Sequence, residues 1–125
     1  MTFCTVINCM DGRVQLPVIQ FLTDHFGVDC VDAITEPGPV RMLAGHADHP
    51  HIPGIIARLR ISVEKHGSVG LAVVGHHDCA GNPVGRQKQL EQTRRSVDFL
   101  RGEVPGLPVI GLWVDEAWQV SVVVP

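Results

Sequence analysis

Two short groups of reactive side chains stand far apart in the sequence. The first runs from Cys9 to Arg13 (Cys-Met-Asp-Gly-Arg), and the second runs from Gly75 to Gly81 (Gly-His-His-Asp-Cys-Ala-Gly). Each group follows directly on an apolar segment that has the composition of a buried strand. If the two strands are neighbours, their ends bring two thiols, an imidazole, a carboxylate and a guanidinium to one place.

Two thiolates and one imidazole are typical ligands of zinc, because thiolate is soft and imidazole is borderline. A set of three protein ligands leaves one tetrahedral position for water, which is the arrangement of a catalytic zinc site. Zinc in such a site lowers the pKa of bound water from 15.7 to about 7 and so provides hydroxide at neutral pH. The sequence therefore predicts Zn²⁺ bound by Cys9, His76 and Cys79.

Asp11 and Arg13 share a loop with the first of these ligands. We expect Asp11 to accept a hydrogen bond from the hydroxide, and Arg13 to hold Asp11 in an ionised, bidentate pair. Without Arg13, the carboxylate could take the fourth zinc position and expel the water. The alternative is a turn carboxylate with an ordinary surface salt bridge, which would contribute little stability.

The remaining histidines and cysteines fit this chemistry less well. His77 is not expected to bind the metal, because adjacent ligands need an unusual backbone geometry. Three loop histidines could relay protons or bind a second metal, although solvated loop histidines are the commoner case; these are His46, His49 and His51. Cys4 and Cys30 lack partners of this kind, so we expect them to be buried as small apolar residues.

The elements that position these residues follow from hydrophobic periodicity and from the glycines and prolines between segments. We expect strands over residues 3–8, 28–35, 68–74, 107–114 and 118–124, helices over 15–25, 55–66 and 84–101, and a long loop over 36–53. This alternation predicts an α/β fold with a mostly parallel sheet flanked by helices and right-handed crossovers. Residues 115–117 are short enough for a hairpin, which makes the C-terminal edge strand antiparallel.

Composition limits the possible functions. A chain of 125 residues with 45% hydrophobic and 18% charged residues is typical of one globular domain. The net charge of -3, without a basic stripe, argues against nucleic-acid binding. No apolar run reaches the ~20 residues of a membrane span, and no leader peptide is evident. We therefore expect a cytoplasmic protein with a small-molecule partner and no membrane association.

The pattern Cys-x-Asp-x-Arg followed later by His-x-x-Cys-(Ala/Gly)-Gly resembles the β-class carbonic anhydrases, in a short, N-terminally truncated form. The similarity runs from about residue 5 to residue 81 and returns in the tail at residues 111–116. The resemblance implies a single zinc domain over residues 1–125 that hydrates carbon dioxide reversibly to bicarbonate. It also implies the zinc ligands named above, Asp11 and Arg13 as a catalytic dyad, and a homodimer or higher homo-oligomer. The apolar segments 107–112 and 118–124 favour oligomerisation as well.

Three alternatives remain open from the sequence. A related hydrolase could act on carbonyl sulfide or carbon disulfide with the same metal site. A non-catalytic zinc domain would have Asp11 as its fourth ligand. A cysteine phosphatase would use the segment from Cys79 to Arg86 as a phosphate loop, but six residues separate this pair where that family has five, and Cys9 and His76 would be left without a role.

Overall fold

The computed structural model describes residues 1–45 and 48–125, so His46 lies outside the described residues. The elements follow one another in the order β1 (Phe3–Cys9), α1 (Gln15–Phe26), β2 (Cys30–Glu36), α2 (Pro39–Ala44), α3 (Ile52–His66), β3 (Leu71–His76), α4 (Arg86–Glu103), β4 (Val109–Val114) and β5 (Val120–Val124). In this part of the chain, no helix combines the length and the apolar character needed to cross a membrane.

The five strands of residues 1–45 and 48–125 join one sheet in the order β2-β1-β3-β4-β5. The first four are parallel, and β5 pairs with β4 in the antiparallel direction. The predicted fold class, a mostly parallel sheet flanked by helices with an antiparallel C-terminal edge strand, is therefore confirmed.

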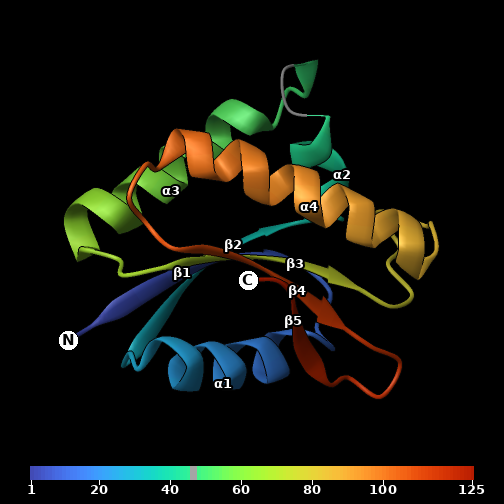
Figure 1. Ribbon diagram of the computed structural model, residues 1–125, viewed down its shortest axis with the longest axis horizontal. Coiled ribbons are helices and arrows are strands. Elements are labelled where there is room, and N and C mark those ends of the chain that lie inside the picture. The colour runs from blue at the N-terminus through green and yellow to red at the C-terminus, as the bar shows by residue number, and fades with distance from the viewer. Residues whose placement is uncertain (46–47) are drawn as a thin grey trace.

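The helices form two layers, one on each face of the sheet. Helix α1 covers one face, whereas α2, α3 and α4 cover the other (Figure 1). The chain moves from β1 to β2 in one direction across the sheet, and from β2 past β1 to β3 and β4 in the opposite direction. The crossover that runs in the first direction passes over one face of the sheet, and those that run in the opposite direction pass over the other face. All crossovers therefore have the same handedness, as expected for parallel strands.

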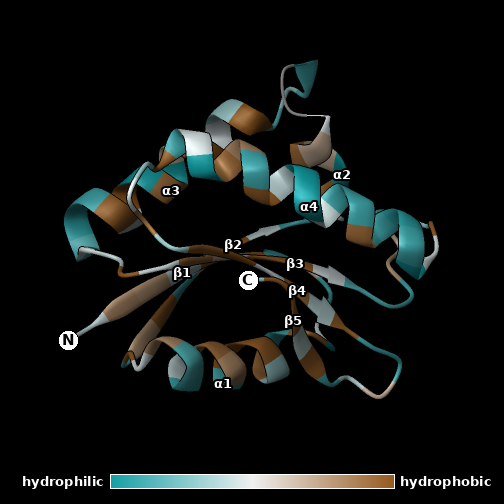
Figure 2. Ribbon diagram, in the orientation of Figure 1, coloured by the Kyte–Doolittle hydropathy of each residue, from teal (hydrophilic) through white to brown (hydrophobic). Residues whose placement is uncertain are grey.

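Alternate residues of each strand point to opposite faces and supply two hydrophobic cores. On one side, Cys4 and Val6 of β1 pack with Val18 and Leu22 of α1. On the other side, Ile7 packs with residues from the other three helices. Every residue of β3 and β4 is buried. These strands are coloured mainly as hydrophobic in Figure 2, while α4 carries hydrophilic residues on its outer side.

The ends of two helices follow the sequence closely, whereas one short helix was not expected. Helices α1 and α3 end at Gly27 and Gly67, each with a left-handed φ of 64°. The prediction of a long loop over residues 36–53 is wrong in part, because α2 occupies Pro39–Ala44. Its prolines and glycines suggested a loop, but Pro39 stands in the first helical turn, where its missing N–H costs nothing.

Candidate metal centre

The chain order reverses between β1 and β3, which lie side by side in the sheet. Cys9 is the last residue of β1 and His76 is the last residue of β3. Because parallel strands end at the same edge, both residues lie at the carboxyl edge of the sheet, at the point where ligands bind in open α/β sheets. Cys79 follows three residues after β3 in the same loop.

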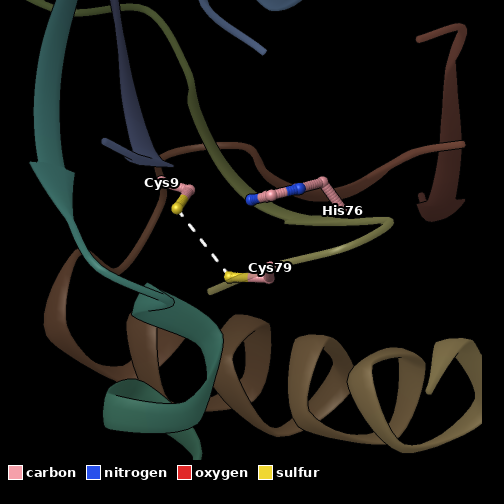
Figure 3. A group of neighbouring side chains, drawn as sticks. All are labelled: Cys9, His76 and Cys79. Carbon is pink, nitrogen blue, oxygen red and sulfur yellow. Dashed lines mark hydrogen bonds between the residues drawn. The ribbon is translucent and has the colours of Figure 1, made fainter. Parts of the chain in front are cut away.

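The ligand atoms of Cys9, His76 and Cys79 lie within 4.8 Å of one another. The two Sγ atoms are 3.8 Å apart, and all three residues are buried. Figure 3 shows the imidazole and both sulfur atoms directed toward a common space. Across residues 1–45 and 48–125, no fourth histidine, cysteine or carboxylate atom joins this group.

His76 presents one ring nitrogen to this space and uses the other elsewhere. Its Nδ1 lies 2.7 Å from the carbonyl oxygen of His77, so it is the nitrogen that donates. Nε2 is buried and has no hydrogen-bond partner among the residues that the structure describes. A buried polar atom without a partner is unfavourable, and a metal ion would satisfy it. The orphaned Nε2 beside two sulfur atoms therefore fits zinc.

Gln89 of α4 fixes the backbone of His76 at the end of the sheet. The Gln89 side chain accepts a hydrogen bond from the N–H of His76 at 3.1 Å and donates to its carbonyl oxygen at 2.8 Å. Both residues are about 1% exposed, so the pair of bonds forms in a dry environment. Gln89 thereby positions the imidazole.

The contact between the two thiols shifts their pKa values in opposite directions. The hydrogen bond from Cys79 lowers the pKa of the Cys9 thiol, and the same bond raises the pKa of Cys79. Cys9 is therefore the thiol that ionises first. Thiolate is the form of cysteine that binds zinc.

Arg13 holds Asp11 through several hydrogen bonds. Its backbone N–H donates to Asp11 Oδ1 at 2.9 Å, and its Nε and Nη2 donate to Oδ1 at 3.1 Å and to Oδ2 at 2.7 Å. These bonds from Arg13 lower the pKa of Asp11 to about 2. Gln15, the first residue of α1, fixes the same loop by donating to the carbonyl oxygens of Cys9 and Asp11 at 2.8 and 2.7 Å.

The Arg13 guanidinium also reaches the second group of reactive residues. Nη1 donates to Asp78 Oδ2 at 3.2 Å, and Nη2 donates to the carbonyl oxygen of Asp78 at 3.1 Å. The ring of Trp118 lies on the guanidinium, with its centroid 4.5 Å from Cζ. Arg13 thus connects the loop of Cys9 to the loop of Cys79.

A cavity of about 200 Å³ adjoins the cluster and is lined by Cys9, Met10, Asp11, Pro37, Ala80 and Gly81. Most of these residues present apolar atoms. One wall depends on a close approach between two loops, because a Cβ added to Gly81 would lie 2.5 Å from the carbonyl carbon of Pro37. The cavity is small and largely apolar, with Asp11 at its edge.

The other predicted residues lie apart from this cavity. His51 contacts Glu36 at 3.5 Å and lines a separate cavity, and the rings of His49 and His51 are 5.0 Å apart. The side chain of His77 is exposed. Cys4 is fully buried, as expected. For Cys30 the expectation of burial is wrong, because this residue begins the edge strand β2 and is only half-buried.

Four residues that contribute to this geometry were not identified from the sequence: Gln15, Asp78, Gln89 and Trp118. Asp78 stood inside a recognised pattern and was named without a role. Gln89 and Trp118 act on residues that tertiary folding brings to them. Gln15 bonds to residues four and six positions before it, but a glutamine at the start of a helix carries no distinctive signal. Gln89 offered the clearest hint, as a glutamine at a position of α4 that faces the sheet.

The sequence model of the family described as "Putative carbonic anhydrase" matches residues 1–124. The chain belongs to this carbonic anhydrase family. A comparison with curated proteins finds no match.

Solved carbonic anhydrases share the fold of this chain. The β-carbonic anhydrase isoform I of Trichomonas vaginalis aligns with a TM-score of 0.65 and 18% identity over 96% of this chain and 81% of that one. The carbonic anhydrase of Streptococcus mutans gives a TM-score of 0.64 and 18% identity over 95% and 80% of the two chains. The alignment with the tetrameric β-carbonic anhydrases of Sordaria macrospora has a TM-score of 0.61 and 14% identity. It covers 95% of this chain and 79% of that one.

Proposed function

We propose that this chain is a zinc-dependent carbonic anhydrase that converts carbon dioxide reversibly to bicarbonate. Cys9, His76 and Cys79 would hold the zinc ion. The observation that carries the proposal is the buried Nε2 of His76, which lacks a partner in the described part of the chain, beside two sulfur atoms 3.8 Å apart. Membership of the carbonic anhydrase family supports it.

When bound, zinc would lower the pKa of a water molecule to about 7 and supply hydroxide at neutral pH. Asp11 is the residue that would orient this nucleophile, by accepting its hydrogen bond at a carboxylate oxygen. The bonds from Arg13 keep Asp11 ionised, because they lower its pKa to about 2. They also hold both carboxylate oxygens, so that Asp11 stays available as an acceptor instead of a metal ligand.

The cavity beside Cys9 and Asp11 would take the substrate. Its volume of about 200 Å³ and its apolar lining from Met10, Pro37 and Ala80 favour a small uncharged molecule such as carbon dioxide. Carbonyl sulfide and carbon disulfide are linear molecules of the same kind, and they remain alternative substrates.

A non-catalytic zinc domain is the second candidate, and it requires Asp11 as a fourth ligand. Arg13 opposes this arrangement, because its guanidinium engages both oxygens of Asp11. A cysteine phosphatase is disfavoured by the family match and by the contact of Cys79 with a second thiol.

We further propose that the protein acts as a homodimer or higher homo-oligomer in the cytoplasm. The carbonic anhydrases of Sordaria macrospora are tetrameric. Strand β5 forms one edge of the sheet and exposes Val122, which is 37% accessible. The four free cysteines fit a reducing compartment. Light scattering that reports a monomer at micromolar concentration would refute the oligomer.

Hydration of carbon dioxide by the zinc-loaded protein tests the proposed activity. The same preparation assayed with carbonyl sulfide and carbon disulfide separates the three substrates. Full zinc content without hydration of any of them would favour the non-catalytic domain.

A further inference from the structure

Two residues beside Arg13 have a left-handed backbone, which is strained at Trp118. In the described part of the chain, only Asp78 and Trp118 among the non-glycine residues have positive φ, at 56° and 59°. Asp tolerates this left-handed conformation, but a bulky side chain such as that of Trp118 rarely adopts it. Both residues contact the guanidinium of Arg13. Strain of this kind persists where the surrounding structure enforces it, and it is common at functional sites.

The β4–β5 turn enforces the conformation of Trp118 through Asp115. Asp115 Oδ1 accepts hydrogen bonds from the N–H groups of Ala117 and Gln119, each at 2.9 Å. The N–H of Trp118 donates to the carbonyl oxygen of Asp115 at 2.9 Å. The indole also packs against the hydrophobic core that contains Cys9 and Cys79. Turn and core together fix the ring over the guanidinium.

The contacts of Arg13 explain why such a ring would matter. Arg13 is 46% exposed at its side chain, whereas Asp11 is 16% exposed. An exposed arginine pays conformational entropy to keep one geometry, so its ion pair contributes little unless other contacts hold it. Asp78 holds Nη1 from one side, and the Trp118 ring covers the guanidinium at 4.5 Å. Cation–π stacking with tryptophan is the strongest of its kind.

We infer that Trp118 is a positioning residue that holds Arg13 in the geometry in which it engages Asp11. The inference rests on the proposed function, since it assigns Trp118 a part in the same site. Trp118 acts through Arg13 and not through the zinc ligands. Its loss therefore leaves the metal in place and weakens the orientation of Asp11.

Three substitutions at Trp118 test the inference with zinc-loaded protein. Trp118→Phe keeps an aromatic face, Trp118→Leu keeps apolar packing without that face, and Trp118→Asn suits the left-handed backbone without the ring. Gln119→Ala is the matched control, because this exposed neighbour uses only its backbone in the turn. The readouts are zinc content, kcat and KM for carbon dioxide, and the ¹H–¹⁵N signal of the Arg13 Nε–H group. The quantity read from that signal is the exchange of the Nε–H proton with solvent, which the hydrogen bonds from Nε to Asp11 slow and which a ring current does not change.

We expect zinc content to be unchanged in all four variants. Trp118→Leu and Trp118→Asn should lower kcat by about 2- to 30-fold, the range of a cation–π contact, and should speed the solvent exchange of the Arg13 Nε–H proton. Trp118→Phe should recover most of both properties, and Gln119→Ala should match the wild type. If Trp118→Leu does not fold, the Asn variant gives the same comparison.

An unchanged exchange rate of the Arg13 Nε–H proton in the Leu or Asn variant overturns the inference, whether or not kcat falls, because a structural role alone would then account for any loss. If zinc-loaded wild type does not hydrate carbon dioxide, the proposed function fails. The exchange rate of the Arg13 Nε–H proton still decides the positioning role in that case, and faster exchange in the Leu and Asn variants would support it.

Discussion

The Sγ atoms of Cys9 and Cys79 lie 3.8 Å apart, although 70 positions separate the two residues in the chain. The parallel pairing of β1 with β3 produces this contact, because each strand delivers one end of the site to the same edge of the sheet. Neither loop forms a metal site alone. Folding and metal binding should therefore depend on each other.

Metal content gives the first prediction. Purified protein should hold about one zinc ion per chain, because two thiolates and one imidazole form a tight zinc site. Replacement of Cys9, His76 or Cys79 by alanine should abolish stoichiometric zinc. Cys30→Ala is the matched control, since Cys30 stands outside the cluster and should leave zinc unchanged. Elemental analysis that finds full zinc in Cys9→Ala would refute the ligand set.

The dyad gives the second prediction. Arg13→Ala should retain zinc but lose most hydration activity, because Asp11 would be free to bind the metal. Asp11→Asn keeps the shape and removes the charge, so turnover should fall by about 10²-fold or more. Arg95→Ala is a suitable control, as Arg95 is 65% exposed and contacts Glu91 on the same helix. Wild-type turnover in both dyad variants would exclude a catalytic role for the pair.

The close contact of two loops gives the third prediction. Gly81→Ala should lower the free energy of unfolding by about 1–3 kcal/mol, because the new Cβ would lie 2.5 Å from Pro37 backbone. Gly54→Ala should instead raise the free energy of unfolding, since Gly54 lies in α3 and no described residue comes within 4 Å of the added Cβ. Alanine at such a helical position stabilises by up to about 1 kcal/mol. Chemical unfolding of both variants measures the two effects, and equal destabilisation would contradict the steric account.

The buried Cys4 thiol gives a pH prediction. Desolvation, and secondarily the charge of Asp32, raises the pKa of Cys4 from 9.0 to about 11. The unfolded chain therefore loses this proton at lower pH than the folded one. The contribution of the neutral thiol to the free energy of unfolding is fully present below pH 9.0 and is lost as the pH rises to about 11. The loss amounts to at most roughly 3 kcal/mol.

Comparison with Cys4→Ala isolates this contribution from other groups that titrate in alkali. The difference in unfolding free energy between wild type and Cys4→Ala should shrink as pH rises through that window. A difference that stays constant with pH would show that the Cys4 thiol does not titrate as described.

Much of the fold and the outline of the site could be predicted from the sequence, because they depend on local patterns. Gly27 and Gly67 marked the ends of two helices, and the reactive residues followed apolar strands. The sequence could not reveal α2, whose prolines resemble a loop until its apolar side chains are buried. Gln89 and Trp118 were missed for a related reason, since their partners are defined only by the packed structure.

Hydration kinetics of the zinc-loaded wild type test the central claim most directly. The rate of carbon dioxide hydration should be measured by stopped flow from about pH 6 to about 9, which brackets the ~7 expected for water in such a zinc site. The proposed function predicts rates well above the uncatalysed reaction, rising with pH across this range and lost in Cys79→Ala. A protein with full zinc that does not accelerate hydration at any pH in the range would contradict it.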